Sequence, residues 1–362
     1  MSGPSRSTCL FLATMIALLL GCQTRKDSHA SERALPTHVP ASPAVVSYVK
    51  IHFEAPIEPE NVTVIPFYSP QGPVVFDRSG AIWYVASEDD ASASFVRWQS
   101  RAPTMQINVS KPDISISDLA FDSQGILWFA FSPIKKPWGV GFGSLSGEQR
   151  FSLIPGTAGQ VSSQIAPSSS GDIWISTAID YELLYLKAGI SPKSYSVEAY
   201  RMAVDSKNRA WFANEQGLGY TTDSGLAHFL TLAPPNEFLL SRQRFGSLSV
   251  TGDDSIWFSF GNPPTVARLD THNKLRLYQI PLHTAYPPLL AACGDAKVWV
   301  SAQVDESWLG LLNIDGSVSQ LRLPTMRDVD YITSDSCQRL ALTADVPEPK
   351  KLQKKRVVLI LI

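Results

Sequence analysis

The sequence predicts an all-β protein folded as a β-propeller of about seven four-stranded blades. One phrase recurs along the chain: residues 75–84, Val-Phe-Asp-Arg-Ser-Gly-Ala-Ile-Trp-Tyr, return in altered form at 120–129 and 203–212. The tryptophans of six such copies are spaced 45, 46, 37, 46 and 42 residues apart. Two further strand-like segments follow most copies. Four antiparallel strands in about 40–45 residues are typical of a propeller blade.

Each part of the phrase has a structural meaning. The apolar runs before the Asp and after the Gly predict two short buried strands. Between them the Asp caps a turn with its side chain, and the Gly supplies a positive φ. Residues that tolerate this conformation occupy the Gly position in five copies: Gly80, Gly125, Gly171, Asn208 and Asp254. Ala296 and Gln338 do not, so we expect the last two turns to differ.

The outer strands of the later repeats are also visible. We expect strands at 265–269 and 274–280, and at 309–314 and 317–323, the second pair joined by the hairpin signal Asp315-Gly316. A four-stranded sheet cannot bury both faces alone, whereas blades stacked around an axis cover one another. A solenoid or sandwich is the alternative architecture, and a count of six blades stays open.

The seventh repeat predicts how the ring closes. It is a degenerate copy over 331–344, with Ala341 in the place of the tryptophan. Strands at 331–333, 340–343 and 356–362 leave it one strand short. Residues 61–67 are the expected fourth strand, because Val-Thr-Val-Ile-Pro at 62–66 resembles Leu-Tyr-Gln-Ile-Pro at 277–281. The last blade is therefore expected to contain both ends of the folded chain.

Residues 1–21 are expected to be a signal peptide. Arg6 precedes an apolar run at 9–20, which is shorter than the roughly 20 residues of a membrane span. The run ends in Leu-Leu-Gly-Cys, which resembles the lipobox of bacterial lipoproteins. The resemblance implies cleavage before Cys22 and its acylation, for example with palmitate. An ordinary secretory signal is the alternative.

The expected domain plan follows from this reading. Residues 22–45 form a polar tether rich in Ala, Ser and Pro, and residues 46–362 form the propeller. Gln23 after the Cys implies sorting to the outer membrane. We therefore expect a lipid-anchored envelope protein, on the outer membrane facing the periplasm or the surface rather than on the inner membrane.

The repeats resemble the propellers of the virginiamycin B (streptogramin) lyase family over residues 47–362, and those of two-component sensor proteins over 201–230. A shared blade indicates the fold more than the function. The lyase resemblance implies a catalytic His before a late inner strand and a Glu four residues beyond a blade Trp. Only Glu215 matches. Pro288 or Leu289 stands in the His place, with His283 five residues before Pro288.

The composition excludes other classes of function. A net charge of −2 and a pI near 6.3 argue against nucleic-acid binding. No His or Cys residues stand at a metal-ligand spacing, so no metal site is expected, and no cofactor except Mg²⁺ if the lyase alternative holds. Neither a Gly-x-Ser-x-Gly elbow nor a phosphate loop is present.

Cys293 and Cys337 are the thiols that remain after processing, apart from Cys22. Both fall in the first turn of neighbouring repeats, on one face of the ring. An exported protein meets an oxidising compartment, and a bridge needs Cα atoms within roughly 7 Å. A disulfide between them is our hypothesis.

The loops after each second strand and before each first strand are expected to meet at one mouth of the ring. Ordinary solvated loops are the alternative interpretation, although Trp and Arg are enriched at interaction hot spots. The binding-face candidates are Lys135, Lys136, Trp138, Asp180, Tyr181, Glu215, Arg242, Arg244, Asp305, Glu306, Trp308 and Arg327.

Together these features predict a membrane-tethered, non-enzymatic, monomeric binding or scaffold module for a protein, glycan or small ligand. The alternative is a streptogramin-lyase-like C–O lyase, or another lactone-cleaving propeller enzyme, with Glu215 and His283 as the catalytic candidates.

Overall fold

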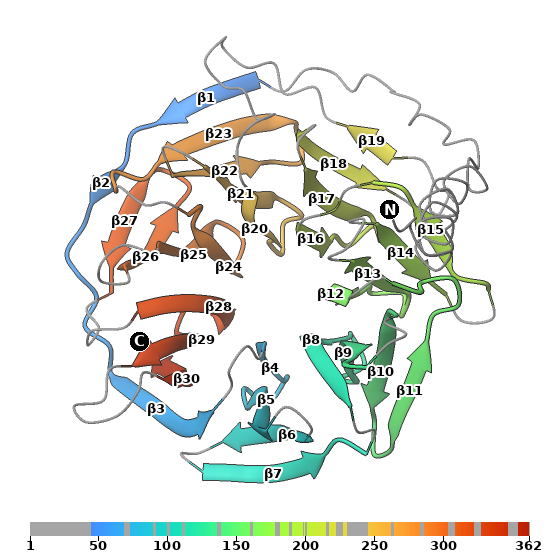
Figure 1. The fold of residues 1–362 in the computed structure, drawn as a ribbon. Helices are drawn as coiled ribbons and strands as arrows, with labels where there is room; N and C mark the ends of the chain where they lie inside the picture. Colours follow the sequence, from blue (N-terminus) through green and yellow to red (C-terminus); the bar gives the residue numbers. More distant parts are fainter. Residues whose placement is uncertain are drawn as a thin grey trace, which may run out of the picture. The chain divides into compact units, whose positions relative to one another are not determined.

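The computed structural model is all-β, with seven sheets arranged in a ring (Figure 1). The part of the chain that the structure describes is residues 45–361, except 69–72, 90–91, 100–101, 111–112, 136–138, 160–161, 178–181, 188–189, 198, 200, 215–216, 222–226, 230–244, 262–263, 283–285, 303–307, 322–326 and 347–353.

Blades 1 to 4 each contain four antiparallel strands that follow one another in sequence from the channel outward. Blade 1 has β4 (Val74–Phe76), β5 (Ile82–Asp89), β6 (Ser92–Gln99) and β7 (Ala102–Asn108). Blade 2 has β8 (Ile114–Phe121), β9 (Leu127–Pro133), β10 (Gly141–Leu145) and β11 (Gln149–Leu153). Blade 3 has β12 (Ser162–Pro167), β13 (Ile173–Thr177), β14 (Leu183–Leu186) and β15 (Lys193–Tyr195). Blade 4 has β16 (Arg201–Val204), β17 (Ala210–Asn214), β18 (Gly217–Thr221) and β19 (Ala227–Phe229).

Blades 5 to 7 also take strands from the N-terminal side of the chain. Blade 5 has β20 (Phe245–Val250), β21 (Ile256–Phe260), β22 (Thr265–Leu269), β23 (Lys274–Gln279) and β1 (Val45–Val49). Blade 6 has β24 (Leu289–Cys293), β25 (Lys297–Ala302), β26 (Trp308–Asn313), β27 (Ser317–Gln320) and β2 (His52–Phe53). Blade 7 has β28 (Arg327–Ser336), β29 (Arg339–Val346), β30 (Lys354–Leu361) and β3 (Asn61–Tyr68).

The predicted propeller and its ring closure are confirmed. β3 pairs antiparallel with β30, from Asn61 opposite Leu361 to Ile65 opposite Val357, so an N-terminal strand closes blade 7 against the C-terminal strand. The folded chain begins earlier than expected, with β1 in blade 5 and β2 in blade 6. The expected strands at 265–269, 274–280, 309–314 and 317–323 correspond to β22, β23, β26 and β27.

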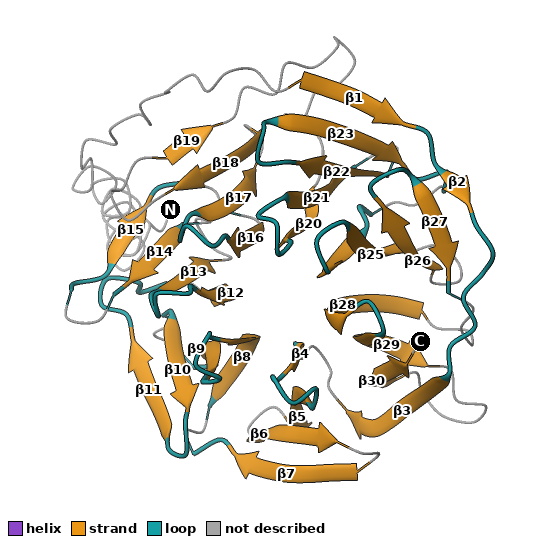
Figure 2. Cartoon of the chain, turned by 180° about the vertical axis from the view of Figure 1, so that it is seen from behind, coloured by secondary structure: helices purple, strands orange, loops and turns teal. Residues whose placement is uncertain are grey.

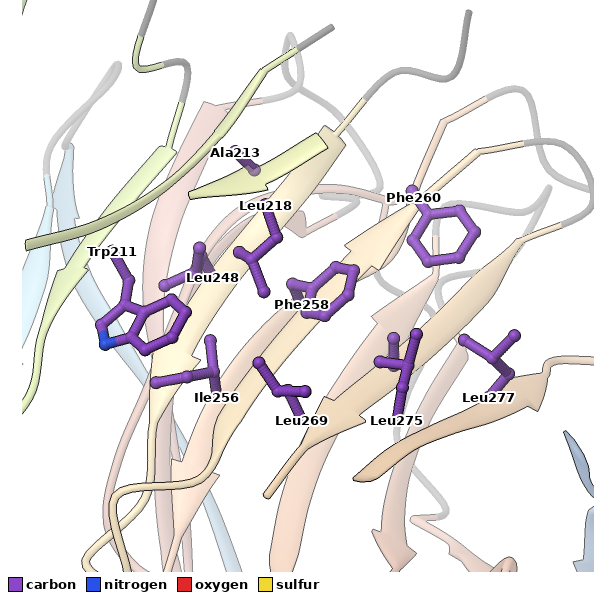
Figure 3. Close-up of a cluster of buried hydrophobic side chains, with 11 residues drawn as sticks. Trp211, Ala213, Leu218, Leu248, Ile256, Phe258, Phe260, Leu269, Leu275 and Leu277 are labelled. Carbon is purple, nitrogen blue, oxygen red and sulfur yellow. The ribbon is translucent and has the colours of Figure 1, made fainter. Parts of the chain in front are cut away.

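The hydrophobic core lies between the blades. Between blades 4 and 5, the indole of Trp211 from β17 lies beside Leu248 and Ile256 from blade 5 (Figure 3). Phe258 and Leu218 belong to the same cluster, and both are fully buried. Burying one such side chain contributes about 1.5–3 kcal/mol, so stacking one blade on the next stabilises the ring.

The turns behave as the repeat predicts. Gly80, Gly125 and Gly171 have φ values of 77°, 83° and 84°, and Asn208 and Asp254 have φ values of 58° and 59°. In blade 6 the positive φ moves to another residue, Gly294, at 66°. Blade 7 turns at residues 337–338 instead. The last two turns therefore differ, as expected.

The sequence did not reveal that residues 45–57 run along the outer rim of blades 5 and 6 (Figure 2). β1 pairs parallel with β23, and β2 pairs parallel with β27. At Gly316, a Cβ would stand 2.6 Å from the carbonyl oxygen of Lys50. Gly316 therefore lets this outer segment pass close to blade 6.

Candidate functional site

A cavity of about 770 Å³ occupies the centre of the ring. Its walls come from the innermost strand of each of the seven blades, and blade 1 contributes Val74 and Val75 of β4. The charged and aromatic residues of the lining are Asp118, Arg201, Asp330 and Tyr331. The other strands contributing to the lining are β8, β12, β16, β20, β24 and β28.

The lining follows a constant position in the repeat, ten residues before the blade tryptophan. Each such residue lies on an innermost strand, and all but Ser247, which lies where the β20–β21 register is irregular, face the residue two beyond the tryptophan or, in blade 7, two beyond Ala341. Asp118 thus pairs with Ala130, and Arg201 with Ala213. From blade 2 to blade 7 this position is occupied by Asp118, Gln164, Arg201, Ser247, Leu289 and Tyr331, which together we call the channel ring.

Members of the channel ring are bonded to the next blade. Asp118 Oδ2 accepts a 2.9 Å hydrogen bond from the backbone N–H of Ile165 in blade 3. Gln164 Oε1 accepts one of 2.8 Å from the N–H of Met202 in blade 4. Each bond crosses from one inner strand to its neighbour. The side chains are therefore held in place from outside their own blade.

The same arrangement continues around the ring. Arg201 donates from Nε to the carbonyl of Gly246 over 3.0 Å, and Ser247 Oγ donates to the carbonyl of Leu290 over 3.4 Å. Tyr331 then donates from its hydroxyl to the carbonyl of Ser117 over 2.9 Å, reaching blade 2 from blade 7. The five polar members of the ring are therefore each hydrogen-bonded to the backbone of another blade, and Leu289 is its apolar member.

The electrostatics of the ring centre on Asp118. Burial raises the pKa of this carboxyl to about 7, although the N–H groups of Ile165 and Leu119 and the charge of Arg201 act in the opposite direction. Burial, together with the nearby charge of Asp118, raises the pKa of Tyr331. Near neutral pH the Tyr331 phenol is therefore protonated and donates a hydrogen bond. The Asp118 carboxyl gains and loses its proton in the same pH range.

Arg201 leaves donors for a ligand. Its Nε is used by Gly246, while its two Nη groups have no hydrogen-bond partner among the residues that the structure describes. A guanidinium held at one nitrogen presents the others as a fork that matches a carboxylate. The channel can therefore bind an anionic group at Arg201 and hydrogen-bond a neutral one around it.

The structure places three of the predicted binding-face residues. Lys135 is exposed and forms a 2.9 Å ion pair with Asp113, a surface contact worth little free energy. Trp308 lies in β26, is 7 % exposed and packs in the core between blades 5 and 6, so it does not belong to a binding face. Arg327 begins β28, with its backbone opposite Asp345.

The remaining site predictions lie outside the described residues and stay predictions. They are Cys22, Lys136, Trp138, Asp180, Tyr181, Glu215, Arg242, Arg244, His283, Asp305 and Glu306.

Cys293 and Cys337 are joined by a disulfide, with Cα atoms 4.9 Å apart. Cys293 ends β24 in blade 6, and Cys337 lies in the first turn of blade 7. Cys293 is 2 % exposed and belongs to the apolar cluster between these blades. The bridge therefore ties blade 6 to blade 7 near the channel.

Within the described ranges, no three His, Cys, Asp or Glu residues are grouped to hold a metal ion. Asp253, for example, accepts hydrogen bonds from Thr251 and Ser255 and pairs with Arg268 over 2.7 Å, so it caps a turn. The described part of the chain contains no helix of the length and apolar character that a membrane crossing requires.

The channel ring was missed because its members share no residue type. The recurring Asp, Gly and Trp mark the fold, while the position ten before the Trp changes from blade to blade. Aligning the copies on the Trp and reading that position would have found Asp118, Gln164 and Arg201 together.

No family model matches the chain, and no curated protein matches it. Solved structures do resemble it. Virginiamycin B lyase from Staphylococcus aureus has a TM-score of 0.63 at 16 % identity, over 83 % of this chain and 99 % of that one. A streptogramin B lyase has a TM-score of 0.62 at 18 % identity, over 83 % and 97 %. YCF48 with a bound peptide has a TM-score of 0.55 at 14 % identity, over 85 % and 98 %. At these identities the likeness shows the fold.

Proposed function

We propose that this chain is a membrane-tethered, non-enzymatic binding module whose central channel takes up a small polar ligand. The observation that carries the proposal is the channel ring, whose five polar side chains are each hydrogen-bonded to another blade around a cavity of about 770 Å³. Ligand sites in proteins commonly enclose about 300–1,000 Å³ and position a few polar groups in this way.

The sequence supports binding over lyase chemistry. The lyase resemblance requires a His that Pro288 or Leu289 replaces here, and Leu289 lines the channel. A leucine side chain cannot transfer a proton, so the expected general base is missing at its own position. Of the two catalytic residues that the lyase resemblance implies, only the Glu, at Glu215, is present.

The tether completes the proposal. The Leu-Leu-Gly-Cys segment at 19–22 supports acylation of Cys22, and Gln23 supports the outer membrane as the site. A tether of about 20 polar residues lets the propeller reach ligand in the envelope without crossing a bilayer. The similar fold of YCF48 with its bound peptide makes a short peptide or a glycan the alternative ligand.

A blocked channel tests the proposal. Ser247→Trp places an indole in the cavity, and Ser191→Trp adds the same indole to an exposed loop as the matched control. The melting temperature of the mature chain in detergent is measured with sugars, organic acids, short peptides, macrocyclic lactones and Mg²⁺. We expect a stabilising compound whose effect survives Ser191→Trp and is lost in Ser247→Trp. Stabilisation that survives in Ser247→Trp, or none at all, would contradict the proposal.

The alternative function is a lactone-cleaving enzyme. The observation in its favour is Asp118, a channel carboxyl whose pKa of about 7 suits proton transfer. Chromatography of a streptogramin B incubated with the chain and Mg²⁺ would reveal a linearised product. Conversion that Glu215→Gln or Asp118→Asn abolishes would establish the enzyme, and intact antibiotic would exclude it.

A further inference from the structure

We propose that the channel selects a small hydroxylated monocarboxylate of the uronic-acid type, with its carboxylate bound by Arg201. The inference rests on the proposed function and names the ligand class of the same site.

Arg201 is placed to bind a carboxylate in the channel. It is the one cation among the described residues that line the channel. Its Nε–H is anchored on the Gly246 carbonyl, which fixes the plane of the guanidinium and leaves both Nη groups for the ligand. Two parallel N–H···O bonds to a carboxylate use this geometry fully, and a neutral group does not.

The carboxyl groups of the wall favour a ligand with one negative charge over a ligand with two. Asp118 and Asp330 line the same cavity as Arg201. A phosphate dianion would bring a second negative charge close to these carboxyl groups and so bind less favourably than a monocarboxylate. A monocarboxylate can pair with Arg201 while its own uncharged part lies toward the aspartates.

The rest of the wall suits hydroxyl groups. Gln164 uses its Oε1 for Met202, so its amide N–H₂ can donate to a ligand. Ser249 Oγ accepts from the N–H of Ala292, so its own hydrogen can be donated. Ser247 donates to Leu290 and retains lone pairs to accept. A ligand hydroxyl both donates and accepts hydrogen bonds, so it can find partners along a wall that offers both donors and acceptors.

Acidification should strengthen binding. The charged and titratable groups that face Asp118 are Arg201 on β16 and Tyr331 on β28, with Asp330 beside Tyr331. A proton on Asp118 removes a negative charge near the ligand carboxylate. We therefore expect D-glucuronate to bind about threefold more tightly at pH 6 than at pH 8.

Calorimetry on the mature, detergent-solubilised chain tests the inference with D-glucuronate, D-glucose and glucose 6-phosphate. We expect glucuronate to bind and both other sugars to bind at least about tenfold more weakly. Arg201→Gln should abolish the preference for the acid, and Arg201→Lys, which retains charge without the fork, should weaken it. Lys207→Gln removes an equal charge outside the channel and should change nothing.

The outcomes separate the two proposals. Glucose binding as well as glucuronate, or a preference that survives Arg201→Gln, would overturn the carboxylate inference. The comparison of the three sugars on the unmodified chain decides the question even if Arg201→Gln fails to fold. A neutral compound whose stabilising effect Ser247→Trp removes would leave channel binding intact while the carboxylate inference fails.

Discussion

Asp205 and Trp211 are joined by a 2.9 Å hydrogen bond from the indole Nε1 to the carboxylate Oδ2, at the first turn of blade 4. The other carboxylate oxygen accepts from the N–H groups of Lys207 and Arg209. One side chain thus caps the turn and fixes the blade tryptophan. The pair recurs as Asp77 with Trp83 and as Asp122 with Trp128.

Asp205→Ala should destabilise the protein by about 3 kcal/mol, because it removes charge-assisted hydrogen bonds from a side chain that is 0 % exposed. Asp270→Ala is the matched control, since Asp270 caps an exposed hairpin through His272 and Lys274 without a tryptophan bond. We expect it to cost about 1 kcal/mol in the same denaturant unfolding experiment. Equal losses would show that the tryptophan bond adds nothing.

The tryptophans of blades 5 and 6, unlike Trp211 in blade 4, lack the hydrogen bond from the indole Nε1 to an aspartate. Thr251 and Cys293 stand where the Asp would be, and the buried Nε1 atoms of Trp257 and Trp299 have no hydrogen-bond partner in the described structure. Trp→Phe removes the same atoms at each site. Trp211→Phe should therefore cost about 1–2 kcal/mol more than Trp257→Phe. Indistinguishable unfolding midpoints for the two variants would refute this reading.

Asp118 predicts a pH dependence of stability. Its pKa is about 7 in the folded state, above the ordinary 3.8, so the folded state holds the proton more tightly. Its contribution is therefore most favourable at low pH and is lost as the pH rises from about 4 to 7. Asp118→Asn should remove this slope and gain stability over the parent at pH 8. Parallel curves of melting temperature against pH would contradict the prediction.

Asp77 makes stability depend on pH in the opposite direction. Burial would raise its pKa, but the hydrogen bonds from Ser79, Trp83, Ala81 and Arg97 outweigh it and hold the pKa at about 2. The resulting stability is present above about pH 4 and is lost as the pH falls towards 2. Asp77→Asn should therefore flatten the acid limb of the unfolding curve between these values. An unchanged acid limb would show that Asp77 does not contribute there.

The disulfide predicts resistance to alkylation. Cys293 and Cys337 should not react with an alkylating reagent until a reductant is added. Because the bridge spans 44 residues, its loss should cost about 3–4 kcal/mol. The double variant Cys293→Ala with Cys337→Ala should melt at one temperature with or without reductant. Two thiols that alkylate freely in the unreduced chain would rule the bridge out.

The fold could be predicted because each blade repeats the same local chemistry. The Asp that caps the turn, the residue with positive φ and the Trp that packs between blades recur at fixed spacing, and β3 shares the pattern of an outer strand. The outer segment at 45–57 could not be predicted in this way. It binds through backbone hydrogen bonds, such as His52 N–H to the Gly316 carbonyl, which leave little trace in side-chain pattern.

The candidate site was harder to predict than the fold. Asp118 and Arg201 lie on different blades, 83 residues apart in the sequence, and only closure of the ring brings both to one cavity. Sequence reasoning instead favoured residues common in loops and hot spots, and so selected Trp308, which packing buries.

Calorimetric titration of the stabilising ligand into the parent chain, Ser191→Trp and Ser247→Trp shows whether the ligand binds in the central channel. Binding in the channel should give one-to-one stoichiometry and equal affinity for the parent and Ser191→Trp, and no measurable heat with folded Ser247→Trp. Undiminished binding to Ser247→Trp would place the ligand outside the channel and rule out the proposed function.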